Sequence, residues 1–164
     1  MEPIGYGANA PEPVRIAGLE KKSADLTVEM DELWSFVRGK CRARWVWAAL
    51  DADTRQVVAM VVGDRSEDTA RRLWAALPPA YRDRAIACTD FWSAYRAAVP
   101  AERHAAAGKE EGLTNHIERF WCTLRQRCAR LVRKTLSFSK CDRNHVGALW
   151  FFVRLYNRSR RCRP

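Results

Sequence analysis

Three acidic residues stand at positions from which their carboxylates could act on one substrate. Asp31 lies in an alternating, strand-like stretch, Asp90 follows a short apolar run, and Glu118 lies near the start of an arginine-rich amphipathic stretch. Converging carboxylates repel each other unless divalent cations neutralise them, and oxygen ligands without His or Cys favour Mg²⁺ or Mn²⁺ over Zn²⁺. Two such ions roughly 4 Å apart can activate a nucleophile and stabilise the leaving oxygen of a phosphodiester.

Each acid also has a purely structural interpretation. Asp31 could be an exposed strand residue beside Glu32, and Asp90 could be the N-cap of a short helix. Asn115 and Glu118 have the spacing of a capping box, in which each side chain satisfies a free backbone N–H. On residue types and spacing alone, both interpretations stay open.

The elements that must position these acids are readable from periodicity and turn residues. Strands are expected over residues 26–37, 44–50 and 56–63, joined by short turns as an antiparallel meander. A helix is expected over 69–77 with Ser66 as its N-cap, and prolines follow it. Further along, the pattern predicts a strand over 85–89, a short helix over 91–99 and a fifth strand over 103–107.

Two long helices follow this region, at 114–134 and 143–156. The apolar residues of the first fall at steps of three, four and seven, which gives one buried stripe: Ile117, Phe120, Trp121, Leu124, Cys128 and Leu131. The whole order predicts an α/β domain with a mixed five-stranded sheet and flanking helices. If the first and fourth strands are neighbours, Asp31 and Asp90 come within a few ångströms of each other.

The positive charge of the chain is concentrated in its last third. Residues 1–118 carry 16 Lys and Arg against 18 Asp and Glu, whereas residues 119–164 carry 13 against one, and the net charge is +10. This segment is also rich in apolar residues, so we expect a folded basic surface in a C-terminal helical extension. Such a surface is typical of nucleic-acid binding, because neutralised phosphates release counterions; a solvated arginine-rich face is the alternative.

Composition sets the remaining limits. The 164 residues suit one domain with a sizeable core, over 27–164, preceded by a flexible lead-in or linker at 1–26 that is rich in Pro and Gly. No charge-free apolar stretch is long enough to span a membrane, and the N-terminus does not resemble a secretory signal, so a cytoplasmic location is expected. The six cysteines have irregular spacing without a C-x-x-C pair, which favours reduced thiols.

Four motifs resemble the insertion-sequence-one (IS-one) transposase family. They are M-D-E-L-W at 30–34, T-D-x-W-x-x-Y at 89–95, H-I-E-R-x-x-x-x-L-R at 116–125 and R-K-T-L-S-F-S-K at 133–140. The resemblance covers roughly residues 28–156. It implies a DDE transposase with a ribonuclease-H-like core, in which Asp31, Asp90 and Glu118 are the catalytic triad and bind Mg²⁺ or Mn²⁺.

The same resemblance implies a reaction and its partners. A metal-activated water would cleave a phosphodiester at the end of an insertion sequence, and the freed 3′-hydroxyl would attack target DNA. Copies of the chain would assemble on DNA. The family's N-terminal zinc-finger and helix-turn-helix region would be supplied by fusion or by a second reading frame, because residues 1–27 are too short for it. The basic residues expected to contact the DNA backbone are Arg119, Arg125, Arg130, Arg133 and Lys134.

Two other functions are weighed against this one. A ribonuclease-H-type nuclease would use the same carboxylates on an RNA–DNA hybrid. A non-catalytic DNA-binding fragment that regulates a full-length transposase would use the basic surface alone, and the intact acids argue against it.

Overall fold

The computed structural model describes residues 26–132, 134 and 136–161. The expected lead-in at 1–26 therefore lies outside the described residues, apart from Leu26. Arg133 and Cys162 also lie outside them. The five other cysteines are all free thiols, as expected.

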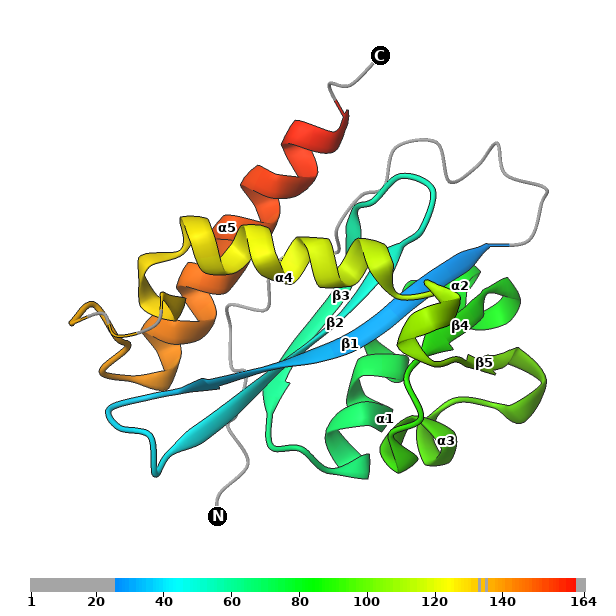
Figure 1. Cartoon of the computed structure of the whole chain (residues 1–164), viewed down its shortest axis with the longest axis horizontal. Helices are drawn as coiled ribbons and strands as arrows, with labels where there is room; N and C mark the ends of the chain where they lie inside the picture. The colour runs from blue at the N-terminus through cyan, green and yellow to red at the C-terminus, as the bar shows by residue number, and fades with distance from the viewer. Residues whose placement is uncertain (1–25, 133, 135, 162–164) are drawn as a thin grey trace.

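A five-stranded mixed sheet forms the centre of the fold (Figure 1). Its strands are β1 (Thr27–Phe36), β2 (Ala43–Asp51), β3 (Val57–Gly63), β4 (Ile86–Thr89) and β5 (His104–Ala106), in the spatial order β3-β2-β1-β4-β5. The first three form the predicted antiparallel meander, and β4 and β5 are added in parallel on the other side of β1. This confirms the α/β class and is consistent with a ribonuclease-H-like fold.

Helices cover both faces of the sheet. One face carries α1 (Glu67–Ala76) and α3 (Ser93–Ala98), and the other carries α4 (Asn115–Arg127) and the long α5 (Asp142–Arg161), as Figure 1 shows. The shorter elements are α2 (Pro79–Arg84) and three single-turn 3₁₀ helices, η2 (Ala101–Arg103), η3 (Lys109–Glu111) and η4 (Ala129–Leu131).

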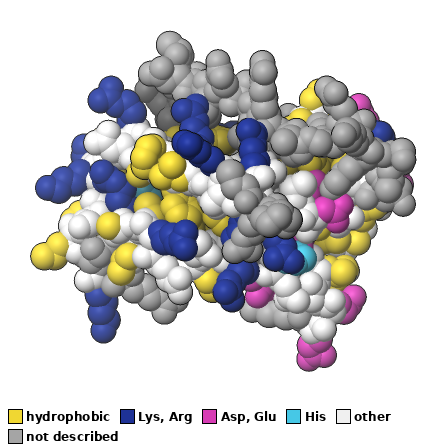
Figure 2. Space-filling view, turned by 90° about the horizontal axis from the view of Figure 1, so that it is seen from above, with side chains coloured by type: hydrophobic (Ala, Val, Ile, Leu, Met, Phe, Trp, Pro, Cys, Tyr) yellow, Lys and Arg dark blue, Asp and Glu magenta, His cyan; other side chains and the backbone are white. Residues whose placement is uncertain are grey.

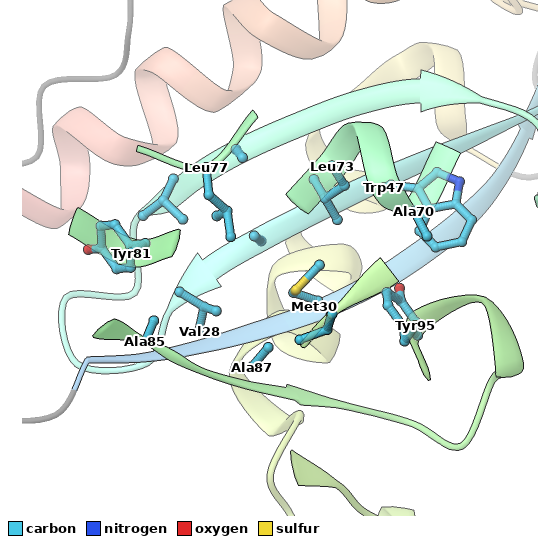
Figure 3. Packing of buried hydrophobic residues seen from close by; sticks show 14 of the residues in the cluster. Val28, Met30, Trp47, Ala70, Leu73, Leu77, Tyr81, Ala85, Ala87 and Tyr95 are labelled. Atoms are coloured by element: carbon cyan, nitrogen blue, oxygen red, sulfur yellow. The ribbon is translucent and has the colours of Figure 1, made fainter. Parts of the chain in front are cut away.

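Strand alternation separates two hydrophobic cores. Val28 and Met30 of β1 and Trp47 of β2 point toward Leu73 of α1 and Tyr95 of α3 (Figure 3). The intervening residues of the same strands face α4 and α5, where the second core is built from side chains that include Leu33, Val46, Leu50, Ile117, Phe120, Leu124, Leu149 and Val153. Each fully buried large side chain contributes about 1.5–3 kcal/mol, so both helical layers are held firmly on the sheet.

Polar contacts fix α5 at two points along its length. Near its start, the His145 ring lies 2.8 Å from Ser139 Oγ and 3.3 Å from Ser35 Oγ. Near its end, the Asn157 amide donates to the carbonyl of Val57 at 2.8 Å and accepts from its N–H at 2.9 Å. Burial lowers the pKa of His145 to about 4, so this ring is neutral near physiological pH.

The structure corrects several expected boundaries. The helix expected over 114–134 ends at Arg127, where Cys128 becomes extended, and η4 follows. The apolar spacing continues beyond the helix because Leu131 in η4 still packs on the same core. The prolines after α1 do not only stop a helix: Pro79 occupies the first position of α2, where a missing N–H costs nothing.

Candidate active site

Asp31 and Asp90 come from neighbouring parallel strands. In the register of β1 and β4, Glu29 lies opposite Cys88. Two residues further, this register brings Asp31 level with Asp90, just beyond the end of β4. Adjacent strands lie about 4.8 Å apart, and the Asp90 charge is close enough to raise the pKa of Asp31. The first and fourth strands are therefore neighbours, which is the condition under which these two acids were expected to come close.

The Asp31 side chain is partly buried and contacts α4. Its Oδ2 accepts a hydrogen bond of 2.9 Å from the Trp121 indole N–H. Burial, together with the charges of Glu32 and Asp90, raises the pKa of Asp31 to about 7, although hydrogen bonds from the Glu32 backbone and Trp121 act in the opposite direction. Trp121 is 5% exposed, which confirms core packing and adds a polar role that the sequence did not indicate.

Without divalent cations, Asp31 should make the protein less stable as the pH rises. Its pKa is about 7 in the folded chain against an ordinary value of 3.8, so its contribution to stability is present below about pH 4 and is lost as the pH rises through 7. We expect Asp31→Asn to raise the free energy of unfolding by about 2–4 kcal/mol near pH 8. Urea unfolding of both proteins at about pH 4 and pH 8 would measure this. Equal stabilities at the higher pH would contradict it.

A buried acid, Glu29, positions the start of α4 on the sheet. Its Oε2 accepts a hydrogen bond of 2.8 Å from the backbone N–H of Ile117, and its Oε1 lies 2.6 Å from Nδ1 of His116. Glu29 is 3% exposed. A carboxylate at a helix N-terminus satisfies a free N–H and interacts favourably with the helix dipole. Glu29, which lies on β1 two residues before Asp31, thus supplies the cap of the helix that carries Glu118.

This contact replaces the expected capping box. The N-cap of α4 is Thr114, without a side-chain hydrogen bond, and Asn115 is already helical. Glu118 therefore stands one position too far along to be the capping glutamate. The interpretation of Asp90 as the N-cap of α3 is also wrong, since α3 begins at Ser93. Asp90 Oδ1 accepts from the Trp92 N–H at 3.0 Å and thereby shapes the turn before that helix.

Glu118 is exposed in the first turn of α4. Its carboxylate makes no hydrogen bond or ion pair with another described residue. The residue before it is bonded to Glu29, and Trp121, three positions later and so on the same side of the helix, is bonded to Asp31. Glu118 thus lies on α4 between two residues that are bonded to β1, with a carboxylate free to take a ligand.

The chemistry of the three predicted carboxylate ligands fits a metal site better than their geometry does. Asp31 and Asp90 are hard oxygen donors whose mutual repulsion a divalent cation would relieve, and this pair fits Mg²⁺ or Mn²⁺. Across the residues that the structure describes, no three His, Cys, Asp or Glu side chains are grouped so that they could hold one ion. The strand register therefore brings Asp31 level with Asp90, but the three predicted ligands do not form one metal-binding group.

Comparison with known proteins gives the family. A family profile described as IS1 transposase matches residues 24–156, which is most of the chain. The chain belongs to the IS1 transposase family. It is 38% identical over 128 residues to the insertion element iso-IS1n protein InsB of Shigella dysenteriae, covering 78% of this chain and 94% of that protein.

Two further relatives agree with this assignment. The chain is 41% identical over 127 residues to the insertion element IS1 protein InsB of Shigella sonnei, covering 77% and 93% of the two chains. The same identity holds with the insertion element IS1 4 protein InsB of Escherichia coli, of which 73% is covered. An IS1 transposase functions in the movement of insertion sequences, so DNA is a partner. No described helix has the length and apolarity needed to cross a membrane.

The described residues of this IS1 transposase that were predicted to contact DNA lie on α4 and in the segment that follows it. Arg119 and Arg125 are on α4, Arg130 is in η4, and Lys134 is exposed just beyond it; Arg133 lies outside the described residues. Figure 2 shows Lys and Arg side chains spread over the left and centre of one face, with Asp and Glu at its right. The family and this distribution suit a DNA-facing surface.

A second polar cluster supports β1 from the opposite face of the sheet. Glu32 accepts hydrogen bonds from Tyr95 Oη at 2.7 Å and Arg65 Nε at 2.9 Å. The Arg65 guanidinium also lies over the rings of Trp45 and Trp92, 4.6 and 4.1 Å from their centroids. Trp92 thus packs within the protein. Glu29, Glu32 and Tyr95 were not predicted as site residues.

Proposed function

We propose that the chain is the catalytic domain of a DDE transposase, which cleaves DNA at the ends of an insertion sequence and transfers the freed strand to target DNA. Asp31, Asp90 and Glu118 would hold Mg²⁺ or Mn²⁺. The observation that carries the proposal is the parallel pairing of β1 with β4, whose register brings Asp31 level with Asp90 just beyond the end of β4. Bound divalent cations would activate the attacking water or 3′-hydroxyl and stabilise the leaving oxygen.

The residues of the chain prepare this chemistry in three ways. Trp121 orients the Asp31 carboxylate through its indole N–H. Glu29 fixes the start of α4 on β1, so that the helix turn with Glu118 keeps a constant position relative to the sheet. Arg119 and Arg125 on the same helix would contact the phosphate backbone and hold the substrate in register, since such contacts position DNA without reading its sequence.

A strand-transfer assay tests the proposal. The chain would be fused to the zinc-finger and helix-turn-helix region of an IS1 relative and supplied with labelled element-end DNA and a target plasmid. We expect strand transfer with Mg²⁺ or Mn²⁺ and none when the cations are chelated. Cleavage of an RNA–DNA hybrid in place of transfer would favour a ribonuclease-H-type nuclease. DNA binding without any cation-dependent cleavage would favour a non-catalytic fragment.

A further inference from the structure

A groove of about 570 Å³ lies at the free edge of β1. In the described part of the chain, β4 pairs with β1 only from Thr27 to Glu29, and the next pairing on that edge is the bridge between Val37 and Ser139. Between these points no described strand lies beside β1 on this edge, whereas β2 pairs with its other edge. The groove lies here, between β1, the C-terminal part of α4 and the segment that follows η4.

The lining of the groove combines positive charge with aromatic surface. Lys40, Arg125, Arg130 and Lys134 contribute four cations, and none of the described residues that line it is acidic. Trp34 is 39% exposed, although tryptophan is usually well buried. Its ring lies 5.5 Å from that of Phe36, which also lines the groove, and the two are tilted by 40°.

The groove is built on the same two elements, β1 and α4, as the proposed active site. Trp34 follows Asp31 on the same strand by three residues, a separation of about 10 Å. On α4, Arg125 stands four residues after Trp121, or about 6 Å along the helix axis, and the Trp121 indole is bonded to Asp31. A polymer bound at the carboxylates could therefore continue along β1 and α4 into the groove.

We propose that this groove binds an unpaired stretch of DNA next to the phosphodiester that reacts, with one base stacked on Trp34. Lys40, Arg125 and Arg130 contact the flanking phosphates. The proposal rests on the proposed function, because it specifies that the DNA extending beyond the carboxylates is single-stranded. The volume is that of a site for one small ligand, which suits one or two nucleotides better than a duplex.

Stacking distinguishes an unpaired strand from a duplex. Bases in a duplex are paired and stacked on each other, so an aromatic side chain reaches their faces only by separating a base step. In a single strand each base offers a free face, and stacking on an aromatic residue contributes strongly whatever the sequence. Loss of Trp34 should therefore weaken single-strand binding selectively, whereas loss of a cation should weaken both forms.

The test measures DNA binding by the full chain with divalent cations chelated. Fluorescence anisotropy would compare labelled oligothymidylate with a duplex of equal length. We expect Trp34→Ala to weaken single-strand binding roughly 5- to 150-fold and duplex binding less than about twofold, with most of the affinity restored in Trp34→Phe. Phe151→Ala is the matched control, because Phe151 is an exposed aromatic residue on α5 outside the groove.

Lys40 gives an independent measurement if Trp34→Ala does not fold. Each phosphate contact to a single strand contributes about 0.7 to the slope of log affinity against log salt. Lys40→Gln should lower the slope by about that amount, whereas Arg71→Gln, which removes an exposed charge on α1, should leave it unchanged. A normal slope in Lys40→Gln would overturn the proposal, as would equal losses on both DNA forms, or no loss, in Trp34→Ala.

The two proposals can fail separately. Binding in the presence of a chelator does not need the carboxylates, so a Trp34-dependent preference for single strands would remain even if strand transfer were absent. Conversely, if strand transfer occurs but Trp34→Ala binds DNA as well as the wild type does, only the groove proposal is contradicted.

Discussion

Asp90→Ala is expected to abolish strand transfer while leaving the fold intact. The Asp90 side chain lies beyond the end of β4 at the mouth of the site, and its one described hydrogen bond shapes the turn before α3. Its removal costs little packing. It deletes one of the two carboxylates that the register of β1 and β4 brings level, and the divalent cation proposed to bind there would lose a ligand. We expect a loss of at least about 10³-fold, comparable to the removal of a key electrostatic group in other enzymes.

The measurement is strand transfer by the fused protein, with circular dichroism and thermal unfolding as tests of folding. Asp83→Ala is the matched control, because Asp83 is an exposed aspartate on α2, away from the candidate site. It should retain full activity. Binding of element-end DNA by Asp90→Ala should stay close to wild type. Strand transfer by Asp90→Ala at more than a few per cent of the wild-type rate would contradict a catalytic role for Asp90.

Glu29→Ala is expected to affect both stability and activity. The substitution leaves the buried N–H of Ile117 without its acceptor and creates a small cavity between β1 and α4. Loss of a buried, charged hydrogen-bond partner costs about 1.5–3 kcal/mol. Since α4 carries both Glu118 and the donor to Asp31, a shift of its first turn displaces two groups at once. A displacement of about 1 Å can reduce a rate about 10²-fold, so we expect strand transfer to fall by that order.

Glu29→Gln separates positioning from direct participation in the chemistry. The amide keeps an oxygen for the Ile117 N–H and nearly the same volume, so most of the stability and more than about a tenth of the activity should return. Urea unfolding and strand transfer, measured on the same preparations at several Mg²⁺ concentrations, would check this. If Glu29→Gln were as inactive as Asp90→Ala while fully folded, Glu29 would itself contact the metal or the substrate.

The sequence was most informative where periodicity and strand ends determine position. Alternation in 26–37 placed Asp31 on the face opposite Met30, and the apolar run before Asp90 placed that acid at a strand end. The meander of the first three strands was predicted, whereas the adjacency of the first and fourth strands was left as a condition that the structure meets. These features are local, so they can be read from neighbouring residues.

Contacts between distant segments were not readable in the same way. Glu29 has the spacing of a residue on the polar side of a strand, and nothing nearby in the sequence shows that α4 covers that side. The capping box failed for the same reason, because a carboxylate 88 residues away already satisfies the Ile117 N–H. The groove beside Trp34 is formed by three segments whose approach depends on how η4 follows α4.

The position of β1 between β2 and β4 determines when during synthesis the sheet can be completed. Parallel pairing of β1 with β4 and the seating of α4 on Glu29 both join segments far apart in the chain, and such contacts form late. A polypeptide still on the ribosome and ending before α4 would carry two of the three carboxylates and little of the basic surface. If the chain cuts DNA as proposed, that activity would therefore arise only after its last third has been made.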